Sequence, residues 1–374
     1  MRKKNILFVF GTRPEVIKLA PVILELKKYP DRYNVIICNT EQQKELSNQT
    51  LSYFNLKADI NLDCMRENQA LADVQSRILS SLEHEVFSKY DIDATIVQGD
   101  TMTVLCGALT SYYRKIPVFH VEAGLRSYDI FEPFPEEIMR QMASRVTALN
   151  FAPTQKNKKA LLNEGIKENT IYITGNTVID ALYCLSDETM QKAQKFYEDK
   201  NIKIDDKLVL ITIHRRENHG ERIDRILYAI EHLVQKYSDH TFVLPVHPNP
   251  NVRGKVYEKL QKYDNVNLLE PLDYPNLVYL MKNAKLILTD SGGIQEEAPS
   301  FGCPTFVMRY ETERQEGIDA GVSVLVGADY NKIVNLSEEI LDKDKQETRL
   351  KAQNPYGTGN SAKTIEKIIN KYFG

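Results

Sequence analysis

The sequence predicts an α/β protein built from two doubly wound domains in tandem, each with a parallel sheet. Three observations support this fold class. The chain has 374 residues, too many for one typical domain and enough for two of about 150 to 190 residues each. Short β-branched runs alternate with amphipathic stretches in two successive series. Unusual polar clusters directly follow the expected strands, which is where ligands bind in open parallel sheets.

The first series of elements predicts βαβ units and therefore a parallel sheet. Strand and helix candidates alternate at Asn5–Phe10, Glu15–Lys28, Asn34–Cys38, Gln42–Tyr53, Ala94–Gln98 and Thr103–Tyr113. The pattern continues with strand candidates at Val118–Val121, Leu149–Ala152 and Ile171–Thr174, and a pair of helices is expected over about Val178 to Lys200.

The second series predicts another sheet of the same kind. Its strand candidates are Leu208–Ile213, Thr241–Val246, Val266–Leu269, Leu286–Thr289 and Thr305–Met308. The stretch Asp187–Asp206 is charged and has no strong apolar face, so we place the boundary near it, with domains at 1–188 and 189–360. The final helix, Ser361–Tyr372 within 361–374, could pack on either domain and is assigned here to the first.

Composition and charge narrow the class of protein. Hydrophobic residues make up 42% and charged residues 26%, as in ordinary globular chains, and the net charge of −3 argues against a nucleic-acid footprint over the whole surface. The five cysteines are odd in number and widely spaced, which predicts reduced thiols in a cytoplasmic protein. The apolar run Ile6 to Phe10 is too short for an export signal, and no stretch approaches the roughly 18 to 20 apolar residues of a membrane span.

The turn after the first expected strand has the features of an anion-binding turn. In Gly11-Thr12-Arg13-Pro14-Glu15, the glycine permits close backbone approach, Pro14 suits a first helical turn, and free N–H groups face any ligand. Arg13 and Lys18 add positive charge. A solvated turn with no ligand is equally compatible with these residues. The turn matches neither the dinucleotide fingerprint nor the Lys-Ser/Thr phosphate loop.

A glycine-rich turn in the second half predicts a nucleotide site more strongly. Ser291, Gly292 and Gly293 open a helix directly after a strand candidate, where backbone N–H groups and the helix dipole favour a diphosphate. Glu297 lies six residues beyond Ser291, where its carboxylate could accept both ribose hydroxyls of a nucleotide. The alternative is a structural turn with Ser291 as N-cap and acidic residues that complement the dipole.

Two further strand ends carry histidine or arginine. His214-Arg215-Arg216-Glu217 combines an imidazole with two guanidinium groups, which suits contacts to phosphate oxygens. Because adjacent arginines cannot point the same way, we expect one to face the ligand and one to pair with a carboxylate. His247 stands in a similar position after Thr241–Val246, but a lone histidine is more often structural.

The first half also gathers acidic residues near its expected site. Four carboxylates stand close to strand ends: Asp100, Glu122, Glu136 and Glu137. Carboxylates beside a phosphate site repel the phosphate charge, so their presence there suggests a role in the chemistry. Such carboxylates can remove and return a proton on carbon. Helix capping by Glu136 and Glu137 and a turn made by Asp100 are the alternatives. No metal-ligand spacing accompanies these residues, so no metal is expected.

The chain resembles the non-hydrolysing UDP-N-acetylglucosamine 2-epimerases of bacteria. The likeness runs from about Lys4 to the C-terminal Asn354-Pro355-Tyr356-Gly357, and seven blocks in order are specific where one alone would not be. The blocks are Gly11-Thr12-Arg13-Pro14-Glu15, Gly99-Asp100-Thr101, His120-Val121-Glu122-Ala123-Gly124-Leu125-Arg126, Pro135-Glu136-Glu137, Gly175-Asn176-Thr177-Val178-Ile179-Asp180, His214-Arg215-Arg216-Glu217-Asn218 and Asp290-Ser291-Gly292-Gly293-Ile294-Gln295-Glu296-Glu297-Ala298-Pro299.

The resemblance implies two Rossmann-like domains facing a central cleft, as in the glycosyltransferase-B fold, with UDP in the cleft. It implies a cofactor-independent isomerase that interconverts UDP-GlcNAc and UDP-ManNAc by anti elimination of UDP to 2-acetamidoglucal and re-addition. A cytoplasmic homodimer that supplies surface polysaccharide synthesis, with no nucleic-acid or membrane partner, is expected from the family. Carried over by position, the catalytic residues are Asp100, Glu122, Glu136 and His214. The UDP-binding residues are Arg13, Lys18, Arg215, His247, Ser291, Gly292, Gly293, Glu297 and Arg314.

The sequence departs from the family pattern at several positions. Gln42 and Gln69 lie in segments that contact a second, activating UDP-GlcNAc in several members, but here the usual motifs around them are altered. Gln98 stands where histidine is usual, and Phe131-Glu132-Pro133-Phe134 replaces the usual Ser-Pro-aromatic segment. Either change could alter the preferred sugar. An epimerase of another UDP-2-acetamido sugar, a hydrolysing epimerase, a glycosyltransferase of the same fold and a non-catalytic nucleotide-sugar sensor are the rival hypotheses.

Overall fold

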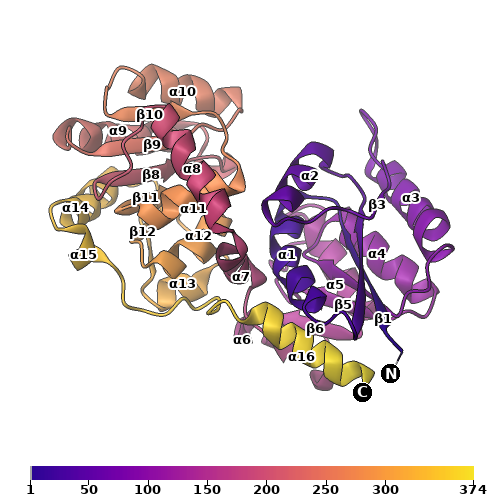
Figure 1. The fold of residues 1–374 in the computed structure, drawn as a ribbon. Helices are drawn as coiled ribbons and strands as arrows, with labels where there is room; N and C mark the ends of the chain where they lie inside the picture. The colour runs from indigo at the N-terminus through magenta and orange to yellow at the C-terminus, as the bar shows by residue number, and fades with distance from the viewer. Residues whose placement is uncertain (1) are drawn as a thin grey trace. The chain divides into compact units, whose positions relative to one another are not determined.

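The computed structural model describes residues 2–374, apart from the side chain of Arg216. The chain forms two compact units. The first runs to Cys184 and includes Tyr356–Gly374, and the second is Leu185–Pro355. Each unit is a parallel sheet with helices packed on it; in Figure 1 the first unit is drawn in indigo to magenta together with the yellow α16, and the second unit in the colours between, through orange. The predicted class, two parallel-sheet α/β domains, is confirmed.

The first unit contains a seven-stranded sheet in the order β3-β2-β1-β4-β5-β6-β7, with every pairing parallel. The strands are β1 Lys4–Phe10, β2 Tyr33–Asn39, β3 Ile60–Asn61, β4 Ala94–Gln98, β5 Val118–Val121, β6 Leu149–Ala152 and β7 Ile171–Ile173. The α-helices are α1 Arg13–Lys27, α2 Lys44–Tyr53, α3 Leu71–Ser81, α4 Met102–Tyr113, α5 Glu136–Val146, α6 Gln155–Asn163, α7 Thr177–Cys184 and α16 Ser361–Phe373. A π-helical turn, Leu82–Phe87, extends α3, and a short 3₁₀ turn spans Glu168–Thr170.

The second unit contains a six-stranded sheet in the order β10-β9-β8-β11-β12-β13. The strands are β8 Leu208–Thr212, β9 Thr241–Pro245, β10 Val266–Leu269, β11 Leu286–Thr289, β12 Thr305–Val307 and β13 Ser323–Leu325. The α-helices are α8 Asp187–Asp199, α9 Glu221–Lys236, α10 Pro250–Leu260, α11 Tyr274–Asn283, α12 Gly292–Glu297, α13 Gln315–Asp319, α14 Tyr330–Leu341 and α15 Lys345–Thr348, with 3₁₀ turns at Arg216–Asn218 and Ala298–Phe301.

Buried strands form the cores because helices cover both faces of each sheet. From Ile6 to Phe10, every side chain of β1 is fully buried, and all five residues of β8 are buried as well. Central strands that are covered on two sides cannot alternate apolar and polar residues, which is why both read as continuous apolar runs. No helix within residues 2–374 is long and apolar enough to cross a membrane.

Two helices outside the alternating βα series, α8 and α16, each pack on the unit to which they belong. The charged stretch Asp187–Asp206 contains α8, the second of the two helices expected over about Val178 to Lys200, and Ala193 and Tyr197 are buried where α8 packs against α11. Tyr197 donates a hydrogen bond to the Asn276 carbonyl oxygen at 2.9 Å. Two apolar residues one turn apart are enough to dock a helix that is otherwise charged. The final helix, α16, packs against α1 and α7 of the first unit, and the Ala362 amide donates to Asp180 Oδ1 at 2.9 Å.

Candidate functional site

Each sheet has one switch point, where the strand order reverses. In the first unit it lies between β1 and β4, which are followed by Gly11-Thr12 and Gly99-Asp100. In the second it lies between β8 and β11, followed by His214-Arg215 and Asp290-Ser291. Ligands of open α/β sheets bind at this place. The motifs that the sequence singles out therefore stand where a ligand is expected in each unit.

A buried carboxylate joins the two turns at the first switch point. Glu15 Oε2 accepts hydrogen bonds from the Gly11 amide at 2.9 Å and the Thr12 amide at 2.7 Å, and Glu15 Oε1 accepts one from the Thr101 hydroxyl at 2.6 Å. Burial raises the pKa of Glu15, and these hydrogen bonds oppose that shift. Glu15 thus fixes the turn that carries Arg13, whose own amide donates to Gln43 Oε1.

Glu122 lies at the end of β5 and is held from two neighbouring elements. Its Oε1 pairs with Lys18 Nζ from α1, and its Oε2 accepts a hydrogen bond from Gln98 Nε2 at the end of β4. Glu122 has φ of 63°, a left-handed backbone conformation that residues other than glycine seldom adopt. A Cβ atom at Gly99 would lie 3.9 Å from Glu122 Oε2, so the Asp100 turn is close by. Lys18, predicted to hold the nucleotide, contacts a predicted acid–base residue in this structure.

Asp100 is paired with an arginine that the sequence did not single out. Asp100 Oδ2 lies 2.6 Å from Arg140 Nη2, and Arg140 Nη1 lies 3.5 Å from Glu137 Oε2. Glu137 is fully buried, whereas Glu136, the first residue of α5, is half-buried. The structure therefore separates these two adjacent glutamates: Glu137 belongs to a buried network, and Glu136 keeps an accessible carboxylate.

His120, between these carboxylates in the chain, is neutral near pH 7. Its imidazole is buried, and burial lowers the pKa of His120 from its ordinary value of 6.5 to about 4. The Nε2–H group donates to the Gly99 carbonyl oxygen at 2.7 Å. His120 therefore supports the turn before Asp100.

Asp290 organises the second switch point. Its carboxylate accepts hydrogen bonds from the His214 and Arg215 amides at 2.9 to 3.1 Å and from Asn218 Nδ2 at 3.0 Å, and His214 Nδ1 lies 3.0 Å from Oδ1. Burial alone would raise the pKa of Asp290, but His214 and the two amides lower it below its ordinary value. The His214 ring also stacks on His247, with centroids 6.1 Å apart. His214, Arg215 and His247, all predicted site residues, thus lie together around Asp290.

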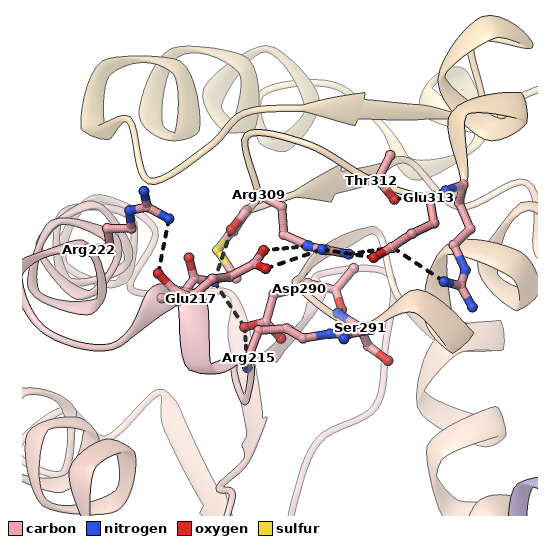
Figure 2. Close-up of polar contacts among 12 residues, drawn as sticks. Arg215, Glu217, Arg222, Asp290, Ser291, Arg309, Thr312 and Glu313 are labelled. Atoms are coloured by element: carbon pink, nitrogen blue, oxygen red, sulfur yellow. Dashed lines mark hydrogen bonds and ion pairs between the residues drawn. The ribbon is translucent and has the colours of Figure 1, made fainter. Parts of the chain in front are cut away.

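The glycine-rich turn lies beside Arg215 and Arg314. A Cβ atom at Gly292 would lie 2.9 Å from Arg314 Cζ, so the guanidinium group occupies the space that a side chain there would need. Arg314 Nε donates to Glu296 at 3.0 Å. Arg215 Nε is buried and has no hydrogen-bond partner among residues 2–374, and Figure 2 shows Arg215 extending toward Ser291. A site with unfilled donor capacity at this turn suits an anion.

A second buried arginine, Arg309, stabilises the loops around this turn. Figure 2 shows its guanidinium group between two carboxylates, Glu217 on one side and Glu313 on the other. One of the two adjacent arginines, Arg215 or Arg216, was expected to pair with a carboxylate; the neighbouring carboxylate of Glu217 pairs with Arg309. The role predicted for the Arg216 side chain lies outside the described residues. Arg309 escaped prediction because Glu217 lies 92 positions away in the chain, and the nearby Glu313 forms no recognised motif with it.

The remaining predicted residues have the following surroundings. Glu297 is buried, and its Oε1 would lie 3.5 Å from a Cβ atom at Gly293, so the carboxylate lies over the start of α12. Gln42 Oε1 accepts from the Thr103 hydroxyl at 3.2 Å, and Gln69 Oε1 accepts from the Arg66 amide at 3.0 Å. Among residues 2–374, no cluster of three or more His, Cys, Asp or Glu side chains that could hold a metal occurs.

The two parallel sheets, each with polar turns at its switch point, place this protein in the class of α/β proteins whose ligands bind at the carboxyl ends of the strands. The chain belongs to the UDP-N-acetylglucosamine 2-epimerase family, whose model matches residues 25–370. The family is one of isomerases.

Individual relatives match along the whole chain. The UDP-N-acetylglucosamine 2-epimerase of Neisseria meningitidis serogroup A is 43% identical over 376 residues, which cover 98% of this chain and 99% of the relative. The structure of a UDP-GlcNAc 2-epimerase from Neisseria meningitidis bound to UDP-GlcNAc has a TM-score of 0.85 at 43% identity, covering 98% and 100% of the two chains. A Listeria monocytogenes crystal structure has a TM-score of 0.91 at 38% identity, covering 100% and 97%.

Proposed function

We propose that this protein interconverts UDP-N-acetylglucosamine and UDP-N-acetylmannosamine by inverting carbon 2 of the sugar. Family membership supports the activity, and the Neisseria relative bound to UDP-GlcNAc supports the substrate. The observation that carries the proposal is the pairing of Asp100 and Glu122 with cations at the ends of adjacent strands. A binding protein for the same nucleotide would have no need to gather two such carboxylates at its switch point.

The nucleotide would be held mainly by the second unit. Arg215 has an unsatisfied donor for the diphosphate, Gly292 and Gly293 would offer backbone amides at the start of α12, and Ser291, whose amide donates to the Thr289 hydroxyl, would offer its own hydroxyl. Glu297 would accept the ribose hydroxyls, while Arg314 and His247 would complete the anion contacts. Arg13 and Lys18 would supply positive charge from the first unit.

The chemistry would proceed by elimination and re-addition. A carboxylate removes the proton from carbon 2, and the electron pair of that C–H bond forms the double bond between carbons 1 and 2. The C1–O bond breaks at the same time, and UDP departs with its electron pair. Re-addition of UDP with protonation on the opposite face gives the other epimer. Asp100, Glu122 and Glu136 are the proposed acid–base residues, and no net oxidation occurs, so no redox cofactor is required.

His214 would stabilise the departing diphosphate. Its Nδ1 faces the Asp290 carboxylate at 3.0 Å, so the ring is oriented and Nε2 is left for the ligand.

Proton NMR of the purified protein with UDP-GlcNAc in deuterated water tests this function. Loss of the carbon 2 proton signal together with the appearance of UDP-ManNAc is expected. Free ManNAc and UDP would instead indicate a hydrolysing epimerase, and transfer to an acceptor without exchange at carbon 2 would indicate a glycosyltransferase. If UDP-GlcNAc is unchanged but another UDP-2-acetamido sugar exchanges, the reaction class stands and the substrate changes. Other UDP-2-acetamido sugars are included because Gln98, which stands where histidine is usual in the family, contacts the proposed acid–base residue Glu122.

We further propose that the protein works in the cytoplasm as a homodimer, without nucleic-acid or membrane partners, and supplies an activated sugar for surface polysaccharides. The family resemblance supports the dimer, and the nucleotide-sugar substrate supports the location. Light scattering of the purified protein tests the dimer, since a single mass near that of one chain would contradict it.

A further inference from the structure

We infer that Arg140 is a positioning residue for the acid–base chemistry, acting through Asp100. This inference rests on the proposed function. Arg140 lies on α5, one turn after Glu136, and its side chain is 7% exposed. Arg140 links the turn after β4, which carries Asp100, to α5, the helix that begins with Glu136.

The geometry of the guanidinium group carries the inference. Arg140 Nη2 lies 2.6 Å from Asp100 Oδ2, and Nη1 lies 3.5 Å from Glu137 Oε2. Arg140 Nε is buried and has no hydrogen-bond partner among residues 2–374, so the two carboxylates fix the orientation of the group. Because guanidinium is planar and rigid, two contacts through different nitrogens set the position of one carboxylate relative to the other.

Glu137 anchors the far side of this arrangement. It is fully buried and accepts hydrogen bonds from the Ser127 amide at 2.9 Å, the Tyr128 amide at 3.2 Å and Gln141 Nε2 at 2.7 Å. Burial alone would raise the pKa of Glu137, but these hydrogen bonds and Arg140 lower it. Glu137 is therefore an ionised fixed point that balances the charge of Arg140, and not a group that exchanges protons with a substrate.

Asp100 differs from Glu137 in a way that fits a working carboxylate. Its side chain is 27% exposed, and its ion pair is made through Oδ2. Oδ1 is thus left to approach a sugar while Arg140 holds the group in place. A carboxylate free to rotate would spend much of its time misaligned, and small misplacements of a catalytic group cost large factors in rate.

A double-mutant cycle tests the inference. The unchanged protein, Arg140→Lys, Asp100→Asn and the double variant are compared by turnover of UDP-GlcNAc and by UDP dissociation constant. Lysine keeps the charge but cannot bridge both carboxylates, so we expect kcat to fall about 10- to 100-fold while UDP affinity changes by less than about threefold. In the Asp100→Asn background the same substitution should change turnover by less than about threefold. Arg140→Met, which loses both contacts, should be worse than lysine.

Arg126→Lys is the matched control. Arg126 is also buried and also contacts α5, since it donates to Ser144 at 3.0 Å, but its ion pair is with Glu164. It should lower the unfolding temperature about as much as Arg140→Lys and leave kcat within about threefold. Losses that multiply in the Asp100→Asn background, or a kcat drop equal to that of Arg126→Lys, would overturn the positioning role. Failure of the unchanged protein to exchange the carbon 2 proton would overturn the proposed function itself.

Discussion

At the scale of single residues, the first unit places each of two acid–base candidates beside a cation from another element. Asp100 has Arg140 from α5, and Glu122 has Lys18 from α1. Such pairs orient a carboxylate without covering it, since both side chains remain partly exposed. Glu136 stands at the start of α5, where the helix dipole favours negative charge. Three carboxylates with three different surroundings can divide the work of acid and base.

Conservative amides at these positions separate catalysis from binding. We expect Asp100→Asn, Glu122→Gln and Glu136→Gln each to lower turnover by about 100-fold or more, because an amide cannot carry the proton. UDP affinity should stay within about threefold for each variant, as the nucleotide contacts lie elsewhere. Turnover comes from the NMR assay and affinity from calorimetry. Normal turnover in all three variants would refute the acid–base assignment.

Substitution of Arg215 should weaken UDP binding, in contrast to the carboxylate variants. Its buried Nε lacks a partner among residues 2–374, and burial lowers the pKa of Arg215, as does the charge of Arg309. A bound anion would accept a hydrogen bond from Nε and offset the burial of the positive charge, so we expect Arg215→Met to weaken UDP binding by about tenfold or more. Arg225→Met, at an exposed position on α9, is the control and should bind UDP normally. Equal UDP affinity in the two variants would count against the diphosphate role of Arg215.

Sequence reasoning found the residues that stand in local motifs and missed those whose partners are distant. Asp100 and Ser291 follow strand candidates directly, so position alone marked them. Arg140 meets Asp100 from 40 positions away in the chain, and Arg309 meets Glu217 from 92. Their function depends on the packing of one element on another, which a single sequence does not disclose. Glu15 was visible within its motif, but its buried contacts to two turns were not.

At the scale of elements, short runs rich in apolar and β-branched residues predicted strands well. β4, β5, β6, β10 and β11 have the predicted ends, because each run is bounded by polar or turn residues. β3 and β13 were missed, since they have only two and three residues and carry no periodicity. Both lie at the edge of a sheet, where pairing with one neighbour rather than a propensity of their own makes them strands.

The turn before α12 leads to a prediction about glycine. At Gly292 a Cβ atom would come within 2.9 Å of Arg314 Cζ, whereas at Gly293 the nearest atom, Glu297 Oε1, would be 3.5 Å away. We expect Gly292→Ala to displace Arg314 and weaken UDP binding about tenfold, and Gly293→Ala to have the smaller effect on geometry. Gly254→Ala in α10 meets nothing within 4 Å and should stabilise the protein by about 0.5 to 1 kcal/mol without changing UDP affinity. Calorimetry and thermal unfolding measure both effects.

At the scale of the whole molecule, the chain builds the first unit from its two ends. Residues up to Cys184 form the sheet, the second unit is inserted, and Tyr356–Gly374 returns to complete the first. Tyr33 donates to Glu366 Oε1 at 3.2 Å, which joins β2 to α16 over 333 positions. From the sequence the final helix could pack on either unit and was assigned to the first; the contacts that place it there join residues far apart in the chain, which periodicity does not disclose.

The stability contributed by His120 in the first unit and by Glu313 in the second should respond to acid in different pH windows. In the first, the pKa of His120 falls from 6.5 to about 4, so the unfolded chain binds a proton more readily, and stability is lost as pH falls from about 6.5 to 4. In the second, Arg309 outweighs burial and lowers the pKa of Glu313 from 4.5 to about 2, so the stability from Glu313 is present above 4.5 and is lost as pH falls toward 2. His120 contributes a slope of up to about 1.4 kcal/mol per pH unit within its window, and Glu313, whose side chain is 42% exposed, contributes less because solvent screens its ion pair.

Denaturant unfolding from pH 7 to pH 3, followed by hydrogen exchange in each unit, tests this difference. His120→Gln removes the titrating group and should flatten the decline of the first unit between pH 6.5 and 4, while Glu313→Gln should change only the second unit, below about pH 4.5. An unchanged decline in His120→Gln would mean that other groups in the first unit drive its acid sensitivity.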